Sequence, residues 1–256
     1  MRTPERPDDD WAFYVDAFRT TSRAGADPAT LIDEAAILGR RGSNGRYDGR
    51  LLVTDDSAFN ALERLGNPHA AIVDVVPSAS RCVELMAALP GYAREDVTAM
   101  VFRDLGAVSE PPLAEGLHLR RAVVDPGEGE VALLDAAAAC LRFDPGAGDL
   151  AVDRFAAYLA SIPDATLFAA TDEAGKVRAT AGSAVFQDLA RIFFVSTDPA
   201  LRRQGIGTAV TAAALNAARD RGAARVSLDA SAAARAIYER LGFTAVGPLV
   251  LFSSLG

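Results

Sequence analysis

Two glycines stand close together in Pro199-Ala-Leu-Arg-Arg-Gln-Gly-Ile-Gly-Thr208. The run just before this segment, Arg191-Ile-Phe-Phe-Val195, is short, aromatic and β-branched, and it predicts a buried strand. The run after it is rich in alanine, and its larger apolar residues recur at helical spacing over residues 209–221. The glycines are therefore expected on a turn that leads from a strand into a helix.

Such a turn has the properties of an anion site. The first N–H groups of a helix have no intrahelical partner and carry partial positive charge, which suits a phosphate. Gly205 and Gly207 lack a Cβ, so an anion can come close to the backbone. Arg202 and Arg203 add charged donors at the rim. We therefore predict a site for a pyrophosphate group.

Three kinds of pyrophosphate site place glycines in this way. A P-loop would have Lys-Ser/Thr directly after its last glycine, but Thr208-Ala209 follows here. A Rossmann turn is closer, since Asp229 lies about 20 residues further on. However, Val210 occupies its third glycine position, and too little chain follows Asp229 to complete a dinucleotide-binding sheet.

The third kind of site matches at every position. Arg202-Arg-Gln-Gly-Ile-Gly207 resembles the Gln/Arg-x-x-Gly-x-Gly/Ala motif of the GCN5-related N-acetyltransferases, the GNAT superfamily. Ile237-Tyr-Glu-Arg-Leu-Gly-Phe243 is similar to the Leu-Tyr-Glu-x-Leu-Gly-Phe motif of the same family. A predicted strand at 225–230 and a predicted helix at 232–240 connect the two motifs in the expected order. The resemblance covers residues 117–256.

The resemblance implies an α/β fold with a mixed central sheet flanked by helices. It also implies transfer of an acetyl group from acetyl-CoA to a primary amine, which attacks the thioester directly. By analogy with the family, the backbone N–H of Val195 would bind the developing oxyanion, and Tyr238 would protonate the departing thiolate as a general acid. The implied cofactor-binding set is Val195, Ser196, Thr197, Arg202, Arg203, Gln204, Gly205, Ile206, Gly207, Thr208 and Ser231.

Several of these residues also have a purely structural interpretation. Residues 192–195 would form a core strand in either case, because side chains can pack while the backbone binds. Tyr238 falls on a helical packing face with Ile237 and Leu241. Ser231 is a good N-cap for the helix that follows it.

The sequence offers no clear general base for deprotonating the amine. Residues 191–196 contain no acidic side chain. Asp188, Asp198 and Asp229 are the nearest carboxylates, and we expect each of them to be structural. A water chain, or an amine that arrives neutral, would then serve instead.

The chain before residue 117 is predicted to contain a second domain. Residues 11–18 carry apolar side chains at helical spacing, a second helix is expected at 28–38, and 40–49 is expected to be a solvated loop. Residues 106–115, with Pro111-Pro112, form the expected linker. Between the loop and the linker we expect strands at 50–54, 70–76 and 96–103, and helices at 57–65 and 78–89.

The N-terminal domain resembles a degenerate copy of the C-terminal one. Leu51-Leu-Val-Thr-Asp-Asp56 can be laid on Phe193-Phe-Val-Ser-Thr-Asp198, and residues 78–92 can be laid on 231–243. At the matching turn, Asp55-Asp56-Ser57 has no glycine pair, and two carboxylates would repel a pyrophosphate. We therefore predict a non-catalytic domain at 1–110 and a catalytic domain at 117–256. The alternative is that a common βαβαβ order produces two chance matches.

The remaining elements of the catalytic domain are expected to border the acceptor. The family places a pair of helices beside the acceptor pocket, and here the pair would come from 130–141 and 152–161, joined by a loop at 144–148. The predicted strands of this region are 117–123, 166–171 and 176–186.

Composition limits the class of protein. The formal net charge of −8, without any dense basic tract, argues against binding of nucleic acid. No run is long enough to span a membrane, and the polar, acidic start has no signal-peptide segment, so we expect a cytoplasmic protein. Cys82 and Cys140 lie in apolar helical contexts and are expected to be reduced core residues. His69 and His118 have no metal-ligand spacing, and no metal site is predicted.

The expected partners are therefore acetyl-CoA and an amine acceptor, with a homodimer as one allowed assembly. Two other functions stay open on the sequence alone. One is a non-catalytic protein that binds or senses acyl-CoA, which the missing base would favour. The other is a dinucleotide-binding protein that uses Gly205, Gly207 and Asp229.

Overall fold

The computed structural model describes residues 11–12, 14–16, 18, 31–34, 37–41, 47–65, 72–143, 152–162 and 164–254. Contacts within the chain group it into two units. Unit 1 comprises Met1–Met100, Asp229–Arg235 and Ala245–Gly256, and unit 2 comprises Val101–Leu228 and Ala236–Thr244. The boundaries of these units differ from those of the predicted domains 1–110 and 117–256, because two segments near the C-terminus belong to unit 1.

Unit 2 is built on a mixed sheet whose strands follow the order β11-β10-β9-β8-β6-β7. Strand β10 is antiparallel to β9 and parallel to β11, so the sheet changes its pairing mode at this strand. β8 and β9 are buried almost throughout, as expected of strands covered on both faces. The bounds are β6 His118–Val123, β7 Glu130–Ala132, β8 Ala165–Thr171, β9 Val177–Phe186, β10 Leu189–Thr197 and β11 Arg225–Ser231.

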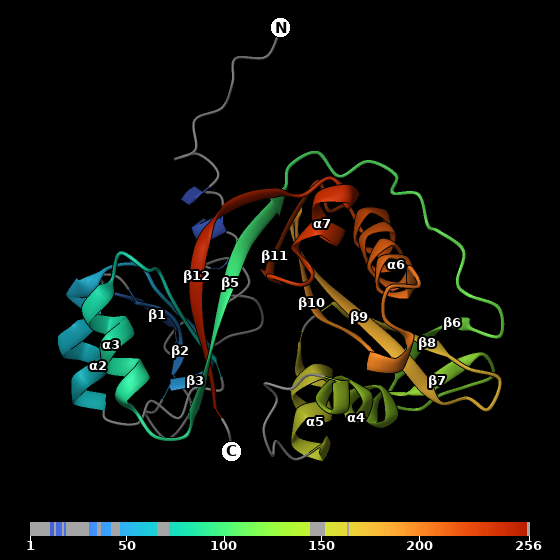
Figure 1. Cartoon of the computed structure of the whole chain (residues 1–256), viewed down its shortest axis with the longest axis horizontal. Helices are drawn as coiled ribbons and strands as arrows, with labels where there is room; N and C mark the ends of the chain where they lie inside the picture. The colour runs from blue at the N-terminus through green and yellow to red at the C-terminus, as the bar shows by residue number, and fades with distance from the viewer. Residues whose placement is uncertain are drawn as a thin grey trace, which may run out of the picture. The chain divides into compact units, whose positions relative to one another are not determined.

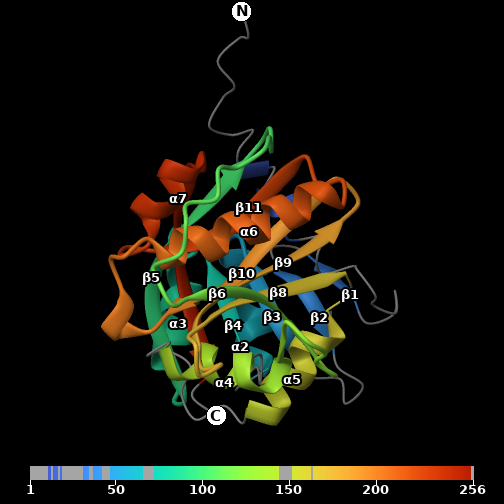
Figure 2. The ribbon, with the colours of Figure 1, turned by 90° about the vertical axis from the view of Figure 1, so that its right-hand side faces the viewer.

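Helices cover both faces of this sheet, which confirms the predicted α/β arrangement. α6 (Ile206–Asp220) packs on β8, β9 and β10 from one side, and Figure 2 shows it lying across these strands. α4 (Leu133–Phe143) and α5 (Val152–Ser161) pack together on the other side (Figure 1). The short helix α7 (Arg235–Leu241) precedes the last strand, β12 (Thr244–Ser254).

The strands of unit 1 follow the order β1-β2-β3-β4-β12-β5. β3 is parallel to β4, whereas β12 pairs with β4 in the antiparallel sense, from Val250↔Val75 to Ser253↔Ile72. Helices α2 (Phe59–Leu65) and α3 (Ser80–Ala88) lie side by side over this sheet (Figure 1). The strand bounds are β1 Leu31–Glu34, β2 Ile37–Arg41, β3 Tyr47–Val53, β4 Ile72–Val75 and β5 Tyr92–Phe102.

The predicted helix at 28–38 is wrong. Residues 31–34 and 37–41 form the antiparallel strands β1 and β2, paired from Leu31↔Arg40 to Glu34↔Ile37. β2 also pairs with β3, and Ile37 is buried in the unit 1 core with only 2% of its surface exposed. Pairing with neighbouring strands and burial of Ile37 therefore outweigh the helical propensity of this alanine-containing run.

Smaller corrections concern where elements begin and end. The loop predicted at 40–49 is partly strand, because β2 continues to Arg41 and β3 begins at Tyr47. The helix predicted at 130–141 starts later, since Glu130–Ala132 pair with β6 as β7. The predicted helix at 232–240 begins only at Arg235. The predicted loop at 144–148 and His69 lie outside the described residues.

The other expected elements form close to their predicted positions. The described residues within 11–18 are helical, and Tyr14 and Phe18 are buried there. Cys82 and Cys140 are buried and form no disulfide, as predicted. Burial, together with the neighbouring Asp56, raises the pKa of Cys82 to about 11, so this thiol stays protonated at neutral pH.

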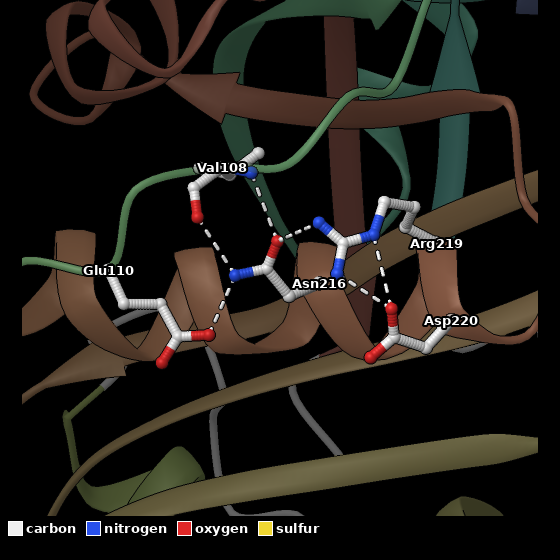
Figure 3. A network of polar contacts seen from close by, with 5 residues as sticks. All are labelled: Val108, Glu110, Asn216, Arg219 and Asp220. Carbon is white, nitrogen blue, oxygen red and sulfur yellow. Dashed lines mark hydrogen bonds and ion pairs between the residues drawn. The ribbon is translucent and has the colours of Figure 1, made fainter.

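The predicted linker is held along α6 by one side chain. Asn216 of α6 accepts a hydrogen bond from Val108 N–H (3.0 Å) and donates to Val108 O (2.9 Å). It also donates to Glu110 Oε1 (2.7 Å) and accepts from Arg219 (3.1 Å), as Figure 3 shows. Because a carboxamide has two N–H donors and an oxygen with two lone pairs, these four bonds use its full capacity.

In the described part of the chain, no helix combines the length and apolar character needed to cross a bilayer.

Candidate functional site

The predicted turn is present between β10 and α6. It consists of a 3-10 helix, η3 (Pro199–Leu201), and a left-handed residue, Gly205, which is the N-cap of α6 with φ of 80°. The first bond inside α6 runs from Ala209 N–H to Gly205 O (3.0 Å), so the amides before Ala209 have no intrahelical partner. A Cβ built at Gly205 would meet no protein atom within 4 Å, so the helix end is open to an approaching ligand. The turn therefore fits an anion.

The turn is tied firmly to the end of β10. A Cβ at Gly207 would lie 3.2 Å from Thr197 Oγ1, which is tighter than an ordinary contact, so glycine lets the helix start close to the strand. Asp198 accepts a hydrogen bond from Ala200 N–H (3.0 Å) and forms an ion pair with Arg178 (2.8 Å). These contacts fix the position of the helix end relative to the strand.

The two arginines of the motif differ in what they contact. Arg202 donates from Nε to Thr197 O (3.2 Å) and from its terminal nitrogen to Phe143 O (3.1 Å), at the end of α4. Its guanidinium thus links α4 to β10 in addition to lying at the turn. Arg203 has a positive φ of 67° and is exposed, as are Gln204 and Gly205, whereas Ile206 is buried.

Strand β10 carries a β-bulge beside the turn. Its pairing with β9 passes from Phe193↔Gly182 to Ser196↔Thr180, so Phe194 and Val195 together face one residue of β9. Phe194 has a positive φ of 49°, which is uncommon for a bulky residue. The described pairing of β10 with β11 joins Leu189–Arg191 to Arg225–Ser227, ahead of the bulge. The bulge thus lies where β10 has left its parallel neighbour.

A buried polar cluster supports the bulge from the α4 side. Thr180, which has no exposed surface, donates a hydrogen bond to Phe194 O (3.0 Å). Its hydroxyl also lies 2.8 Å from Ser196 Oγ and 3.0 Å from the sulfur of Cys140. No local sequence signal marks Thr180 or Cys140, because they meet β10 only through strand register and helix packing.

Tyr238 lies in an aromatic cluster. Only 5% of its surface is exposed, and its ring meets the edge of Phe243 at a centroid distance of 5.9 Å. Phe243 in turn packs against Phe102 at 5.4 Å. The packing interpretation of Tyr238 is therefore correct, and the general-acid role stays a prediction beside it. Tyr238 belongs to unit 2 together with residues 195–208, whereas Ser231 belongs to unit 1.

The three carboxylates near the motif have structural partners. Asp188 accepts two hydrogen bonds from Arg225, both of 3.0 Å, and these bonds lower the pKa of Asp188. Asp198 caps η3, as described above. Asp229 accepts a hydrogen bond from the hydroxyl of Tyr14, a residue of unit 1 that is completely buried. None of these three described carboxylates stands without a partner, which agrees with their expected structural roles.

Comparison with known proteins gives one family. Residues 132–243 match the model of the Acetyltransferase (GNAT) family. The mycothiol acetyltransferase of Salinispora arenicola is 33% identical over 168 residues, which are 60% of this chain and 53% of that protein. The chain thus matches about half the length of this curated relative.

Solved structures share the fold. A GCN5-related N-acetyltransferase from Sphaerobacter thermophilus superposes with a TM-score of 0.56 at 17% identity, covering 90% of this chain and 82% of that one. A GCN5-related N-acetyltransferase-like protein from Streptococcus suis has a TM-score of 0.54 at 15% identity, covering 95% of this chain and 99% of that one. At such identities the likeness concerns the fold alone.

Proposed function

We propose that this chain is an N-acetyltransferase, because residues 132–243 match the model of the acetyltransferase (GNAT) family. Its substrates would be acetyl-CoA and a primary amine. The observation that carries the proposal is the turn at Gly205, where a helix end with unpartnered first-turn amides is open to an anion and directly follows a bulged strand. A pyrophosphate on this turn would place the rest of the cofactor along β10.

The residues of the turn would bind the cofactor in a simple way. The backbone amides of residues 205–208 would hold the pyrophosphate oxygens, and Arg203 and Gln204 would supply further donors from the rim. The backbone of Val195, Ser196 and Thr197 would pair with the amide-containing arm, as an added strand does. Arg202 would act mainly by fixing Thr197, since its guanidinium already bonds Thr197 O.

The chemistry requires one charge to be stabilised and one proton to be delivered. Acetyl-CoA supplies an acetyl thioester, to whose carbonyl carbon the amine nitrogen forms a bond while the carbon–sulfur bond breaks. Val195 N–H would bind the carbonyl oxygen as it becomes negative. Tyr238 would give its hydroxyl proton to the departing sulfur, and the amine would lose its proton to water, since the nearby carboxylates are occupied.

The first experiment is a thermal-shift comparison of ligands. Acetyl-CoA at about a hundred times its dissociation constant should stabilise the protein by roughly 2.7 kcal/mol. Gly205→Glu should abolish this stabilisation, because a carboxylate would occupy and repel the anion site. Gly91→Glu, which adds the same charge at an exposed glycine that also has a positive φ (84°) and no atom within 4 Å of its Cβ, is the matched control and should show the wild-type shift with acetyl-CoA.

The outcomes separate the proposed function from its alternatives. Stabilisation by NAD or NADP in place of acetyl-CoA would refute the acetyltransferase proposal in favour of a dinucleotide. Acetyl-CoA binding without release of free thiol, across a panel of primary amines, would favour a sensor of acyl-CoA. Binding together with amine-dependent thiol release would support the enzyme.

A further inference from the structure

The hydroxyl of Thr180 holds together three groups around the bulge. It lies 3.0 Å from Phe194 O, 2.8 Å from Ser196 Oγ and 3.0 Å from Cys140 Sγ. Thr180 and Cys140 are buried, with 0% and 4% of their surfaces exposed. This cluster connects β9, β10 and α4 at one atom.

The proton positions in this cluster follow from the chemistry of its members. Phe194 O is a carbonyl oxygen and can only accept, so the single hydroxyl proton of Thr180 is used for that bond. The two lone pairs of Thr180 Oγ1 then accept from Ser196 O–H and from the Cys140 thiol. The Cys140 sulfur also lies 4.0 Å from Phe194 O, so the bond of 3.0 Å from Thr180 is the shorter of the two contacts to this carbonyl.

The bond to Phe194 O also sets the direction of a second group. Phe194 C=O and Val195 N–H belong to the same peptide unit, which is planar and trans, so the two bonds point in opposite directions. With the carbonyl directed at Thr180, Val195 N–H is directed away from it. This N–H is the group that the proposed function assigns to the acetyl carbonyl.

The local backbone does not favour this arrangement by itself. A positive φ at a bulky residue such as Phe194 is unfavourable and persists only where its surroundings impose it. The ring of Phe194 packs at right angles on Phe155, with centroids 4.7 Å apart, and meets Phe193 at 5.3 Å. Ring packing therefore fixes the side chain of Phe194, and Thr180 fixes its carbonyl.

We propose that Thr180 is a positioning residue that orients the Val195 amide toward the acetyl carbonyl, with Cys140 and Ser196 directing its proton. The inference rests on the proposed function, because it assigns a purpose to the amide that the function requires. Thr180 itself touches neither substrate. Its effect should appear in recognition of the acetyl group and not in recognition of the rest of the cofactor.

The test compares binding of acetyl-CoA with binding of CoA by calorimetry. Thr180→Val removes the hydroxyl at nearly constant volume, Thr180→Ser retains it, and Thr166→Val is a matched control at another buried threonine, on β8. Thr180→Val should lower the affinity for acetyl-CoA by about 2- to 10-fold, which is the effect of one lost hydrogen bond, and should leave the affinity for CoA unchanged. Thr180→Ser and Thr166→Val should bind both ligands as wild type does.

A spectroscopic signature distinguishes orientation of the amide from a general loss of packing. Acetyl-CoA labelled with 13C at the acetyl carbonyl should show a lowered carbonyl stretching frequency when bound to wild type, because a hydrogen bond weakens the C=O bond. In Thr180→Val the band should move back toward its value in solution, and in Thr180→Ser it should stay lowered. Should Thr180→Val not fold, Thr180→Cys, with a similar volume and a weaker donor, takes its place with the same expectations.

The outcomes separate the two proposals. A wild-type protein that binds no acetyl-CoA refutes the proposed function. Suppose that the wild type binds acetyl-CoA with a lowered carbonyl stretching frequency, and that Thr180→Val shows the same frequency and the same affinity. This result overturns the role of Thr180 and leaves the proposed function intact. An equal loss of affinity for acetyl-CoA and for CoA in Thr180→Val would also overturn the role of Thr180, because the hydroxyl would then support the fold and not the acetyl site.

Discussion

Gly182 and Phe193 face each other across β9 and β10, and the aromatic ring covers the glycine. A Cβ built at Gly182 would lie 2.3–2.9 Å from three ring carbons of Phe193. Such distances are not tolerated, so any side chain at 182 has to displace the ring. Phe193 belongs to the pair of rings beside the bulge, which makes this glycine part of the support of the site.

We predict that Gly182→Ala lowers the free energy of unfolding by about 1–3 kcal/mol, the usual cost of overpacking a buried site. Denaturant unfolding monitored by circular dichroism measures this. Gly106→Ala is the control, because its Cβ would meet nothing within 4 Å, and its effect should stay within about 0.5 kcal/mol. Equal stabilities for the two variants would mean that the ring of Phe193 moves without cost.

At the scale of elements, the segment from β5 to β6 is fastened to α6 by Asn216 (Figure 3). The two bonds to Val108 resemble the pairing of a strand, although they come from one side chain. A second anchor lies nearby, where Leu105 N–H donates to Ala224 O (2.8 Å). The segment thus follows the helix through specific hydrogen bonds as well as through packing.

We predict that Asn216→Leu speeds amide hydrogen exchange at Val108 roughly 10-fold or more, since two hydrogen bonds of about 1 kcal/mol each are lost. Exchange followed by NMR or mass spectrometry measures this. Glu110→Ala, which removes only the outer contact of the carboxamide, should leave Val108 protected. An unchanged exchange rate in Asn216→Leu would show that packing alone holds the segment.

The elements around the turn could be predicted because their signals are local. Apolar residues of β10, the two glycines and the alanine-rich helix follow one another within a single stretch of chain, and each restricts its own backbone. The hairpin of β1 and β2 could not be predicted in this way, because Ile37 becomes a core residue only when β2 pairs with β3. The bulge at Phe194 was missed for the same reason, because it is defined by the register of β10 on β9.

At the scale of the whole molecule, the two units repeat an order of elements. β3, η2 (Asp56–Ala58), α2, β4 and α3 of unit 1 follow the same sequence as β10, η3, α6, β11 and α7, with both strand pairs parallel. Asp55 caps η2 by accepting from Ser57 N–H (2.8 Å), as Asp198 caps η3. In unit 1, however, Asp56 accepts from Cys82 N–H (3.1 Å) in the first turn of α3. Asp55 and Asp56 thus stand in the turn before α2, at the place that the glycine turn before α6 takes in unit 2.

We therefore predict that one chain binds a single molecule of acetyl-CoA. Titration calorimetry should give a stoichiometry of one, and Gly205→Glu should remove all binding. The physical reason is the repulsion between Asp55, Asp56 and a pyrophosphate in unit 1. A stoichiometry of two, or binding that survives in Gly205→Glu, would contradict the non-catalytic assignment of residues 1–110.

The pairing of β12 with β4 has a consequence for the order in which the protein is made. Val75 and Val250 are partners in one sheet, although β4 is synthesised well before β12. β4 therefore emerges without one of its two neighbours, and this edge stays unpaired until β12 leaves the ribosome. Unit 2 can assemble most of its sheet in the meantime. Unit 1 is thus completed only after β12 has been made.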